Sequence, residues 1–389
     1  MSRSDVAGAA WAIGIMTGTS ADGADAALVA IDRGAAPRKT RLVALRSRPY
    51  APELRSRVLR AQEGTLAMRE LLALHVELGR HAALAARDVL EAPEAMGSRP
   101  LVVGLHGQTV FHDPHGLRSG IPLSAQLGDP SVVAQALECS VVSNFRMADV
   151  LEGGEGAPLV PRFDHHQFAS QKRDRVLLNL GGIANLTRLR PAAKIADVVA
   201  FDCGPGNMLL DALVSALAPG GPSYDAEGAL AARGRADEGV VREFLADPFI
   251  LRRYPKSAGR EEYGSGYLAR FLKRTEGLGV EDRLRTAVAI TAGAVAQGVA
   301  LTGGAPDEVY VSGGGARNRT LLEAIRQALP KSRVATTDAL GVPVEAKEAM
   351  AFAFLAFESI SGRPGNVPSS TGARKEVVLG SITPPPTPR

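Results

Sequence analysis

The chain has 389 residues, of which 45% are hydrophobic, 22% are charged and 5% are aromatic, and its formal net charge is +4. This length accommodates two domains or one large α/β unit, and the composition is that of a globular protein that buries a core. The charge is spread along the chain without a block of Lys and Arg, so we expect no nucleic acid partner. Anionic small molecules are the better match for this mildly basic chain.

Cysteine usage and hydropathy argue against several other classes. Cys139 and Cys203 are the only cysteines and neither belongs to a Cys-x-x-Cys pair, which argues against zinc and against a disulfide framework. The first ten residues lack the apolar core of a signal peptide. The uncharged stretch 286–306 is rich in small residues, so we expect a buried helix and no membrane partner. These features predict a cytoplasmic location.

The first part of the chain predicts an α/β domain. Hydrophobic periodicity predicts three strands, at 11–17, 24–31 and 41–48. Two helices, at 52–63 and 65–92, and a strand at 101–105 are expected to follow. A helix is expected after Asp129-Pro130, because Pro is favoured at the first helical position. A short strand at 141–143 then leads into a glycine-rich loop.

The second part begins in the same way, with a strand, turn and strand at 175–189. A third strand, an apolar helix, a fourth strand and a final helix are expected at 198–202, 286–301, 308–311 and 348–360. The proline-rich end predicts a flexible tail from about residue 384. We therefore expect two related α/β domains, at 1–150 and 151–389, around a cleft that the turns of both hairpins face.

The most informative segment is the glycine-rich turn at 14–25, with the sequence GIMTGTSADGAD, which lies between two apolar runs. Its backbone N–H groups and hydroxyls match an anion, whereas Asp22 and Asp25 match a cation. Donors and carboxylates on one turn point to a nucleotide phosphate carried with Mg²⁺. An ordinary Gly/Asp hairpin is the alternative interpretation of this segment alone.

Three further glycine-rich turns follow predicted strands, with the sequences LGGIANL, DCGPGN and SGGGARN. The chain has no Gly-Lys-Ser/Thr, so it has no Walker A sequence. Four glycine-rich turns of this kind in one chain resemble the actin-like sugar kinase superfamily. In that superfamily two hairpin turns hold the phosphates and a later glycine-rich turn holds the adenosine.

The wording of the motifs resembles one family in particular, the anhydro-N-acetylmuramic acid kinases. The matching blocks, in the order of the family from about residue 13 to about 382, are GIMTGTSADGAD, HGQTVFHDP, FRMADVLEGGEGAPLVP, LNLGGIANLT, FDCGPGN, KSAGRE, SGGGARN and NVPSSTGA. The resemblance implies two related actin-like (ribonuclease H-like) domains around a nucleotide-binding cleft. It also implies phosphorylation of 1,6-anhydro-N-acetylmuramic acid at O6 by ATP and Mg²⁺, with hydrolytic opening of the anhydro ring. The products would be N-acetylmuramic acid 6-phosphate and ADP, formed in cell-wall recycling, and the family suggests a homodimer.

The resemblance assigns Asp202 as the catalytic base that activates water, with a carboxylate that caps the following helix or turn as the alternative. Asp22 and Asp25 are expected to face Mg²⁺, and a structural carboxylate is the alternative for Asp25. Asn318 either contacts the nucleotide or caps the next helix. The residues expected to contact the nucleotide are Gly18, Thr19, Ser20, Ala21, Asp22, Gly23, Ala24, Asp25, Gly181, Gly182, Gly204, Gly206, Asn207, Gly313, Gly314, Gly315 and Asn318.

The expected sugar contacts are His106, Gln108, Arg146 and Glu348. Arg146 is the candidate partner of the lactyl carboxylate, because a guanidinium pairs with a carboxylate through two hydrogen bonds. The alternatives are a surface Arg for Arg146, a first-turn helix carboxylate for Glu348, and a core histidine for His106. Two histidine pairs without accompanying ligands are expected in loops rather than at metal sites, namely His112 with His115 and His165 with His166.

Five positions depart from the family pattern. The family usually has Ser, Gly, Asp, Thr and Thr where this chain has Thr17, Ser143, Asn144, Cys203 and Ala258. The candidate base and the phosphate turn are kept, but Asn144 removes a carboxylate near the expected sugar pocket and leaves the exact sugar preference open. A kinase of another 1,6-anhydro-sugar such as levoglucosan is one alternative. A non-catalytic ATP-binding scaffold of the same fold is the other.

Overall fold

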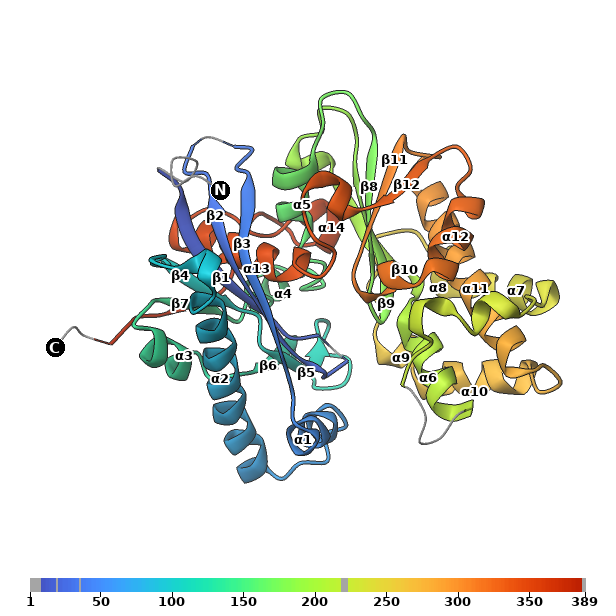
Figure 1. Ribbon diagram of the computed structural model, residues 1–389, viewed down its shortest axis with the longest axis horizontal. Coiled ribbons are helices and arrows are strands. Elements are labelled where there is room, and N and C mark those ends of the chain that lie inside the picture. The colour runs from blue at the N-terminus through green and yellow to red at the C-terminus, as the bar shows by residue number, and fades with distance from the viewer. Residues whose placement is uncertain (1–7, 19, 35, 218–222, 387–389) are drawn as a thin grey trace. The chain divides into compact units, whose positions relative to one another are not determined.

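The computed structural model describes residues 8–18, 20–34, 36–217 and 223–386. The chain divides into two compact units (Figure 1): unit 1 comprises Met1–Phe168 and Ala346–Arg389, and unit 2 comprises Ala169–Glu345. Each unit has its own mixed β-sheet and its own hydrophobic core.

Unit 1 contains a six-stranded sheet in the order β13-β7-β4-β1-β2-β3. The first three strands form an antiparallel meander, β4 and β7 continue parallel to β1, and β13 closes the edge antiparallel to β7. A separate hairpin, β5-β6, follows β4. The bounds are Ala10–Met16 (β1), Gly23–Ile31 (β2), Thr40–Pro49 (β3), Val102–Leu105 (β4), Gln108–Asp113 (β5), Leu123–Leu127 (β6), Val141–Ser143 (β7) and Ser381–Thr383 (β13).

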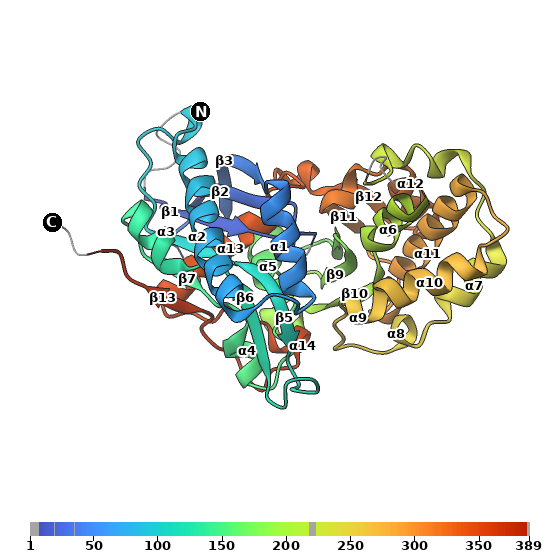
Figure 2. The same ribbon diagram turned by 90° about the horizontal axis from the view of Figure 1, so that it is seen from below.

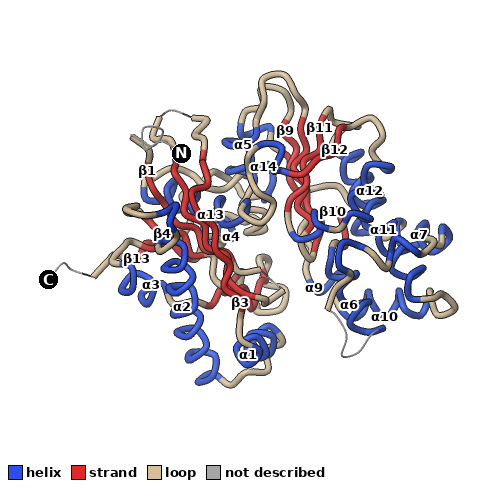
Figure 3. The backbone as a smooth tube through the Cα atoms, in the orientation of Figure 1, coloured by secondary structure: helices blue, strands red, loops and turns tan. Residues whose placement is uncertain are grey.

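Unit 2 contains a five-stranded sheet in the order β10-β9-β8-β11-β12. Its first three strands are again an antiparallel meander, and its last two again run parallel to the first. Both sheets therefore have the order 3-2-1-4-5, which confirms the two related α/β domains of the ribonuclease H-like arrangement (Figure 3). The bounds are Arg175–Leu180 (β8), Ile183–Leu189 (β9), Val199–Pro205 (β10), Glu308–Ser312 (β11) and Arg333–Thr336 (β12).

Helices surround both sheets. Those described in unit 1 are Pro52–Gln62 (α1), Met68–Leu90 (α2), Pro130–Leu137 (α3), Met147–Leu151 (α4), Pro161–Phe168 (α5), Lys347–Ile360 (α13) and Pro368–Thr371 (α14). Those described in unit 2 are Asn207–Leu217 (α6), Glu238–Leu245 (α7), Pro248–Leu251 (α8), Arg260–Tyr263 (α9), Ser265–Arg274 (α10), Val280–Leu301 (α11) and Arg319–Ala328 (α12). The N-cap of α3 is Asp129, which accepts a hydrogen bond from Ser131 N, as the Asp-Pro signal predicts.

The sheet of unit 1 is covered on both faces because side chains alternate along β1. Ile13 and Ile15 face a core that they share with the alanine-rich face of α2. Gly14 faces the other way and allows α13 to lie directly on the strand, since a Cβ at this position would be 1.8 Å from Ala349 O. Gly104 in β4 does the same against Phe352 O.

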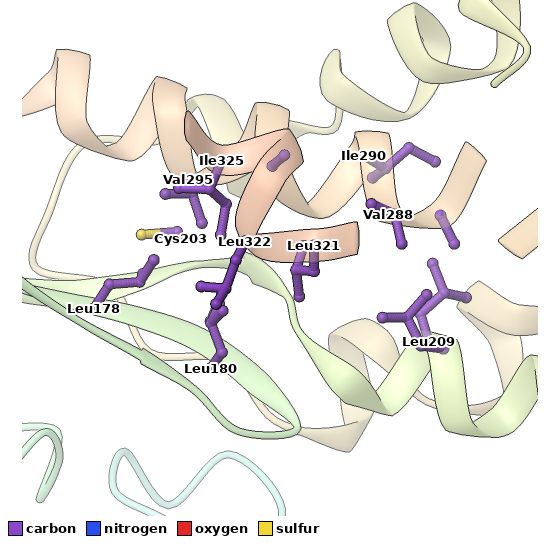
Figure 4. Packing of buried hydrophobic residues seen from close by; sticks show 14 of the residues in the cluster. Leu178, Leu180, Cys203, Leu209, Val288, Ile290, Val295, Leu321, Leu322 and Ile325 are labelled. Carbon is purple, nitrogen blue, oxygen red and sulfur yellow. The ribbon is translucent and has the colours of Figure 1, made fainter. Parts of the chain in front are cut away.

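The core of unit 2 is built around α11, which lies among α6 and α7 (Figure 2) and contacts β9 and β10. Figure 4 shows Val288 and Val295 of α11 in the same cluster as Leu178 of β8 and Ile325 of α12. Among the described residues, α11 is the one helix that is long and apolar enough to cross a membrane. Of its apolar 18-residue stretch, 61% is buried inside the protein. The expectation of a buried helix here is confirmed.

The division of the chain differs from the expected boundaries at 150 and 151. Helix α5 and the whole segment from Ala346 onward pack with the first unit. The physical reason is the fit of α13 on Gly14 and Gly104, which closes the back of the first sheet with a helix from the end of the chain. Residues 387–389 of the expected flexible tail lie outside the described residues, and β13 ends just before that tail begins.

Both cysteines are buried and neither is in a disulfide. Cys139 belongs to the core of unit 1 and Cys203 to the core of unit 2. Burial raises the pKa of Cys139 to about 11 and raises that of Cys203 as well. The Cys203 side chain fills the space beside Gly298 of α11, which explains how a thiol is accommodated next to the candidate base.

The close approach of α13 to β1 gives a first testable prediction. Gly14→Ala would overlap the Ala349 backbone and is expected to destabilise unit 1 by roughly 3 kcal/mol. Trp11 in β1 is the only tryptophan, so its fluorescence in a urea titration reports this unit. Gly34→Ala is the control, because a Cβ at that position would have no atom within 4 Å. Equal midpoints for the two variants would contradict the packing argument.

Candidate active site

The turn between β1 and β2 is held in place by side chains from other elements of unit 1. The carbonyl of Gly18 accepts a hydrogen bond from Gln108 Nε2 at 2.8 Å, and Gln108 Oε1 accepts one from the Tyr50 hydroxyl at 3.3 Å. Arg55 Nε donates to the carbonyl of Ala21 at 3.2 Å. Ala21 is buried and has a positive φ of 53°. Gly18 and Ala21, on either side of the undescribed Thr19, are therefore each held by a side chain from another element.

This arrangement gives Gln108 a role that sequence reasoning did not assign. It was expected to contact the sugar, and the structure places its buried amide between the carbonyl of Gly18 and the hydroxyl of Tyr50. Thr19, another expected nucleotide contact, lies outside the described residues. Ser20 is exposed, whereas Thr17, which replaces the usual Ser, is buried with its hydroxyl unpartnered.

The two candidate Mg²⁺ ligands differ in their surroundings. Asp22 is exposed in the turn. Asp25 is half-buried on β2 opposite Met16, and its Oδ1 accepts a hydrogen bond of 2.5 Å from the Ser47 hydroxyl, so a structural role is also present. In the part of the chain that is described, no group of three or more His, Cys, Asp or Glu side chains converges on a metal position. One or two carboxylates fit Mg²⁺, which takes its remaining ligands from water and phosphate.

The buried His106 and the half-buried Arg146 form a pair in unit 1. Arg146 Nη2 lies 2.9 Å from His106 Nε2, and Arg146 Nη1 donates to the carbonyl of Gly156 at 2.8 Å. A guanidinium has no acceptor, so His106 Nε2 must accept and carries no proton. Burial and the guanidinium hold the pKa of His106 well below its usual value. Arg146 is therefore no simple surface residue, and its orientation is fixed.

A cavity of about 310 Å³ lies within unit 1, and of this pair His106 belongs to its lining. Its lining includes His75, His106, Ser124, Gln126, Asn144 and Met147. The size and the mixture of polar and apolar groups are those of a site for a small polar molecule. Asn144 has a φ of 56°, a left-handed conformation that Asn tolerates better than most residues. The departure from the family pattern at this position therefore falls on the wall of the cavity.

Asp149 is a structural centre of this region that sequence reasoning missed. It is fully buried, and its Oδ2 accepts a hydrogen bond from Gly156 N at 2.8 Å. Its Oδ1 accepts one from Asn366 Nδ2 at 2.8 Å and one from the Thr371 hydroxyl at 2.7 Å. The carbonyl of the same residue, Gly156, accepts the hydrogen bond from Arg146 Nη1. Asp149 therefore holds the residue that orients the guanidinium. The sequence feature that could have indicated Asp149 is its position in the FRMAD block, three residues after Arg146.

Glu348 lies in the first turn of α13, where a carboxylate interacts favourably with the helix dipole. It is half-buried, and it belongs to the same unit as His106 and Arg146 rather than to the second domain, as the sequence boundaries implied. Its neighbour Lys347 forms a buried ion pair with Asp164 of α5, at 3.0 Å.

Three of the four paired histidines lie outside the expected loops, and His115 lies in one. His112 lies on β5 and bonds to the Ser124 hydroxyl at 2.8 Å, whereas His115 is in the connection after that strand. His165 and His166 both lie in α5. Charged or polar helix and strand residues of this kind carry weak periodicity, which is why the sequence did not indicate these elements.

In unit 2 the first glycine-rich turn is joined to the start of α6. The carbonyls of Gly181 and Gly182 accept hydrogen bonds from Asn207 N at 2.8 Å and from Gly206 N at 2.9 Å. A Cβ on Gly206 would be 2.4 Å from the carbonyl oxygen of Gly181. The LGG and GPGN turns therefore form one packed structure. Gly204 is different, because a Cβ there would meet Ala294 of α11 at 2.8 Å, which makes it a core-packing glycine.

The SGGGARN turn after β11 was expected to use its missing side chains to admit the nucleotide. The structure shows a different use at two positions: a Cβ on Gly313 would be 2.4 Å from Asn179 Oδ1, and one on Gly315 would be 2.6 Å from Leu180 Cβ. Gly314 is open, with no contact closer than 3.6 Å. Asn318 is the N-cap of α12 and accepts from Leu321 N at 2.9 Å, which is the capping alternative.

Asp202 lies on β10, half-buried, just before a register shift against β9. Its Oδ2 accepts a hydrogen bond of 2.7 Å from Ala258 N and one of 3.3 Å from the Ser257 hydroxyl. Helix α6 begins only at Asn207, so Asp202 is not the N-cap of that helix. The carboxylate is instead oriented by the KSAG segment, which matches a group held ready for chemistry.

Two sheets of the same order, with glycine-rich turns after their first strands, define a protein of the actin-like ATPase and sugar kinase class. A family model described as anhydro-N-acetylmuramic acid kinase matches residues 10–385. The chain is 36% identical over 383 residues to an anhydro-N-acetylmuramic acid kinase of Caldanaerobacter subterraneus subsp. tengcongensis, which covers 95% of this chain and 96% of that protein. The chain therefore belongs to the anhydro-N-acetylmuramic acid kinase family and is an enzyme, which confirms the resemblance of its motifs.

Solved structures similar over 90% of this chain are more distant. Component A of (R)-2-hydroxyglutaryl-CoA dehydratase from Acidaminococcus fermentans matches over 99% of its chain with 12% identity and a TM-score of 0.45. A ROK family glucokinase from Streptomyces griseus, in complex with glucose and AMPPNP, matches over 99% of its chain with 14% identity and a TM-score of 0.40. Nothing about the ligands of this chain follows from likenesses at this level.

The buried histidines of unit 1 predict a loss of stability in mild acid. Burial lowers the pKa of His106, of His112 to about 4 and of His166 to about 3, so the unfolded chain binds protons below pH 6.5 that the folded chain does not. The free energy of unfolding therefore falls with decreasing pH, by about 1 kcal/mol per pH unit for a fully buried group.

Urea midpoints from Trp11 fluorescence at pH 7.5, 6.5 and 5.5 measure this effect. His166→Gln is expected to reduce the slope of the midpoint against pH, and His115→Gln, at an exposed position, is the matched control. An unchanged slope in His166→Gln would refute the assignment.

Proposed function

We propose that this enzyme uses ATP to phosphorylate 1,6-anhydro-N-acetylmuramic acid at O6 while water opens the anhydro ring. The products are N-acetylmuramic acid 6-phosphate and ADP. The observation that carries the proposal is the oriented carboxylate of Asp202, in a chain of this family that also has a bound carbonyl at Gly18 and a cavity lined by His106.

Asp202 is the group that we assign to water activation. Its carboxylate takes a proton from water as the water oxygen bonds to the anomeric carbon. The bond between the anomeric carbon and O6 breaks, and its electron pair passes to O6. O6 then bonds to the γ-phosphorus, and ADP leaves with the electron pair of the broken phosphoanhydride bond. Each transferred group is thereby accounted for, and the ring opens in the same reaction that forms the phosphate ester.

The remaining roles are positional, because phosphoryl transfer depends on alignment and charge neutralisation. We assign the turn at Gly18 and the joined turns at Gly182 and Gly206 to the phosphates, and the open Gly314 to the adenosine side. Asp22 and Asp25 are the residues that would hold hydrated Mg²⁺. When bound, Mg²⁺ neutralises charge on the phosphates.

For the sugar we assign Arg146 to the lactyl carboxylate, and we assign the cavity lined by its partner His106 as the binding pocket. The guanidinium is fixed by Gly156 and His106, so little side-chain entropy is lost on pairing. We further propose that the enzyme serves cell-wall recycling in the cytoplasm, for which the two unpaired cysteines are the supporting feature.

The decisive experiment is mass spectrometry of the product formed from Mg·ATP and 1,6-anhydro-N-acetylmuramic acid in ¹⁸O-labelled water. The product is expected to gain one phosphoryl group and one labelled water. Asp202→Asn keeps the size of the side chain but removes the base, and should lower kcat by 10²-fold to 10⁴-fold. A phosphorylated product without ¹⁸O would refute the ring opening. ATP binding without sugar-dependent ADP release would favour the scaffold alternative.

A second prediction tests the sugar assignment. Arg146→Ala is expected to raise KM for anhydro-N-acetylmuramic acid by about 30-fold, corresponding to about 2 kcal/mol for one charge-assisted contact, and to spare activity on a neutral anhydro-sugar. Arg80→Ala, on the exposed face of α2, is the control. Equal losses on both sugars would mean that Arg146 is structural, and preference for levoglucosan by the wild type would transfer the proposal to that substrate.

A further inference from the structure

We infer that the segment Lys256–Ala258 is the positioning element of Asp202, and that the buried ammonium group of Lys256 is its anchor. The inference rests on the proposed function, in which Asp202 is the base, and adds a residue to which that function assigned no role. All of the residues concerned lie in unit 2.

Three consecutive residues bind Asp202. The backbone carbonyl of Lys256 accepts a hydrogen bond from Asp202 N at 3.2 Å. Ser257 donates from its hydroxyl, and Ala258 from its backbone N–H, to the same carboxylate oxygen, Oδ2. The backbone and the side chain of Asp202 are thus both bound to one short segment, so any displacement of that segment would move the carboxylate.

The anchor of this segment is deeply buried. The Lys256 side chain is 1% exposed, and its Nζ donates to the carbonyls of Phe249 and Ile250, each at 2.9 Å. These carbonyls belong to the last turn of α8, where the partial negative charge of a helix end favours a cation. The ring centroids of Phe201 and Phe249 lie 5.3 and 5.0 Å from Nζ. Phe201 immediately precedes Asp202 on β10, and Phe249 lies in α8. The ammonium group therefore contacts both the strand that carries Asp202 and the helix that holds Lys256.

A buried charge of this kind is costly, which indicates a role beyond filling space. Desolvation lowers the pKa of Lys256, and the partners of its ammonium are neutral carbonyls rather than a carboxylate. An apolar side chain of similar length would fill the same volume without that cost. A lysine, however, joins the segment to α8 with two directional hydrogen bonds, and its positive charge interacts with Asp202.

The neighbouring residue, Cys203, makes different contacts. Its side chain lies in the core of unit 2 against Gly298, at the irregularity in the pairing of β10 with β9. The hydrogen bonds to the Asp202 carboxylate come from Ser257 and Ala258.

The test compares Lys256→Met and Lys256→Gln with Lys273→Met, an exposed lysine on α10 of the same unit. We expect Lys256→Met to lower kcat by about 100-fold, because small displacements of a reacting group have effects of this size. KM for ATP and for the sugar should change less than 3-fold. Lys256→Gln keeps a donor without the charge and should fall between Lys256→Met and the wild type. An unchanged kcat in Lys256→Met would overturn the inference.

A double variant distinguishes positioning from a general structural effect. If Lys256 acts through Asp202, adding Lys256→Met to Asp202→Asn should lower single-turnover ADP release by less than 3-fold further. A further 100-fold loss would show that Lys256 acts independently of Asp202 and would overturn the inference. Full activity of Asp202→Asn alone would instead refute the proposed function, so the two failures are distinguishable.

If the Lys256 variants fail to fold, by circular dichroism and by loss of nucleotide binding, the other end of the segment supplies the test. Ala258→Pro removes the N–H that donates to Oδ2, and Ser257→Ala removes the longer hydroxyl bond. We expect at least a 30-fold loss of kcat in the first, less than a 10-fold loss in the second, and unchanged KM values in both. Wild-type kcat in Ala258→Pro would overturn the inference.

Discussion

The close contact between α13 and the first sheet is the constraint on which unit 1 depends. It exists because β1 and β4 each place a glycine on the face that α13 covers, so that the helix backbone lies against the strands. The contact recruits the last part of the chain to the first unit and brings Glu348, Asn366 and Thr371 with it. Asp149 then binds the two latter residues, and the loop that orients Arg146 is fixed as a result. A packing requirement thus assembles polar groups from distant parts of the sequence.

Unit 2 uses its glycines in another way. Most of the glycine-rich turns are tied to one another, because backbone carbonyls and side chains occupy the positions where Cβ atoms would be. The result is a set of turns whose backbone conformation is fixed by packing, so a ligand bound there would cost little conformational entropy. Asp202 has the same property, since its orientation comes from the KSAG segment and, through Lys256, from α8. Polar groups held in place by neighbouring elements therefore occur in each unit.

The sequence predicted the sheets well because their strands are buried and apolar: 11–17 became β1 at Ala10–Met16, and 24–31 became β2 at Gly23–Ile31. It did not predict the β5-β6 hairpin, whose alternation is interrupted by His and Gln residues that make specific polar contacts. That α13 belongs to unit 1 could not be predicted from its position late in the chain, because it depends on how the helix packs against Gly14 and Gly104. Buried polar anchors such as Asp149 were missed because an isolated charged residue looks the same in a sequence whether it is solvated or enclosed.

The buried thiols have a practical consequence. Each unit contains one cysteine, enclosed in its own core, with a pKa raised by burial and therefore little thiolate at neutral pH. An alkylating reagent can react only when the surrounding core opens. Cys139 and Cys203 are thus intrinsic probes of local unfolding, one in each unit. Their labelling rates, resolved by peptide mapping, would report the opening of each unit separately and without an engineered probe.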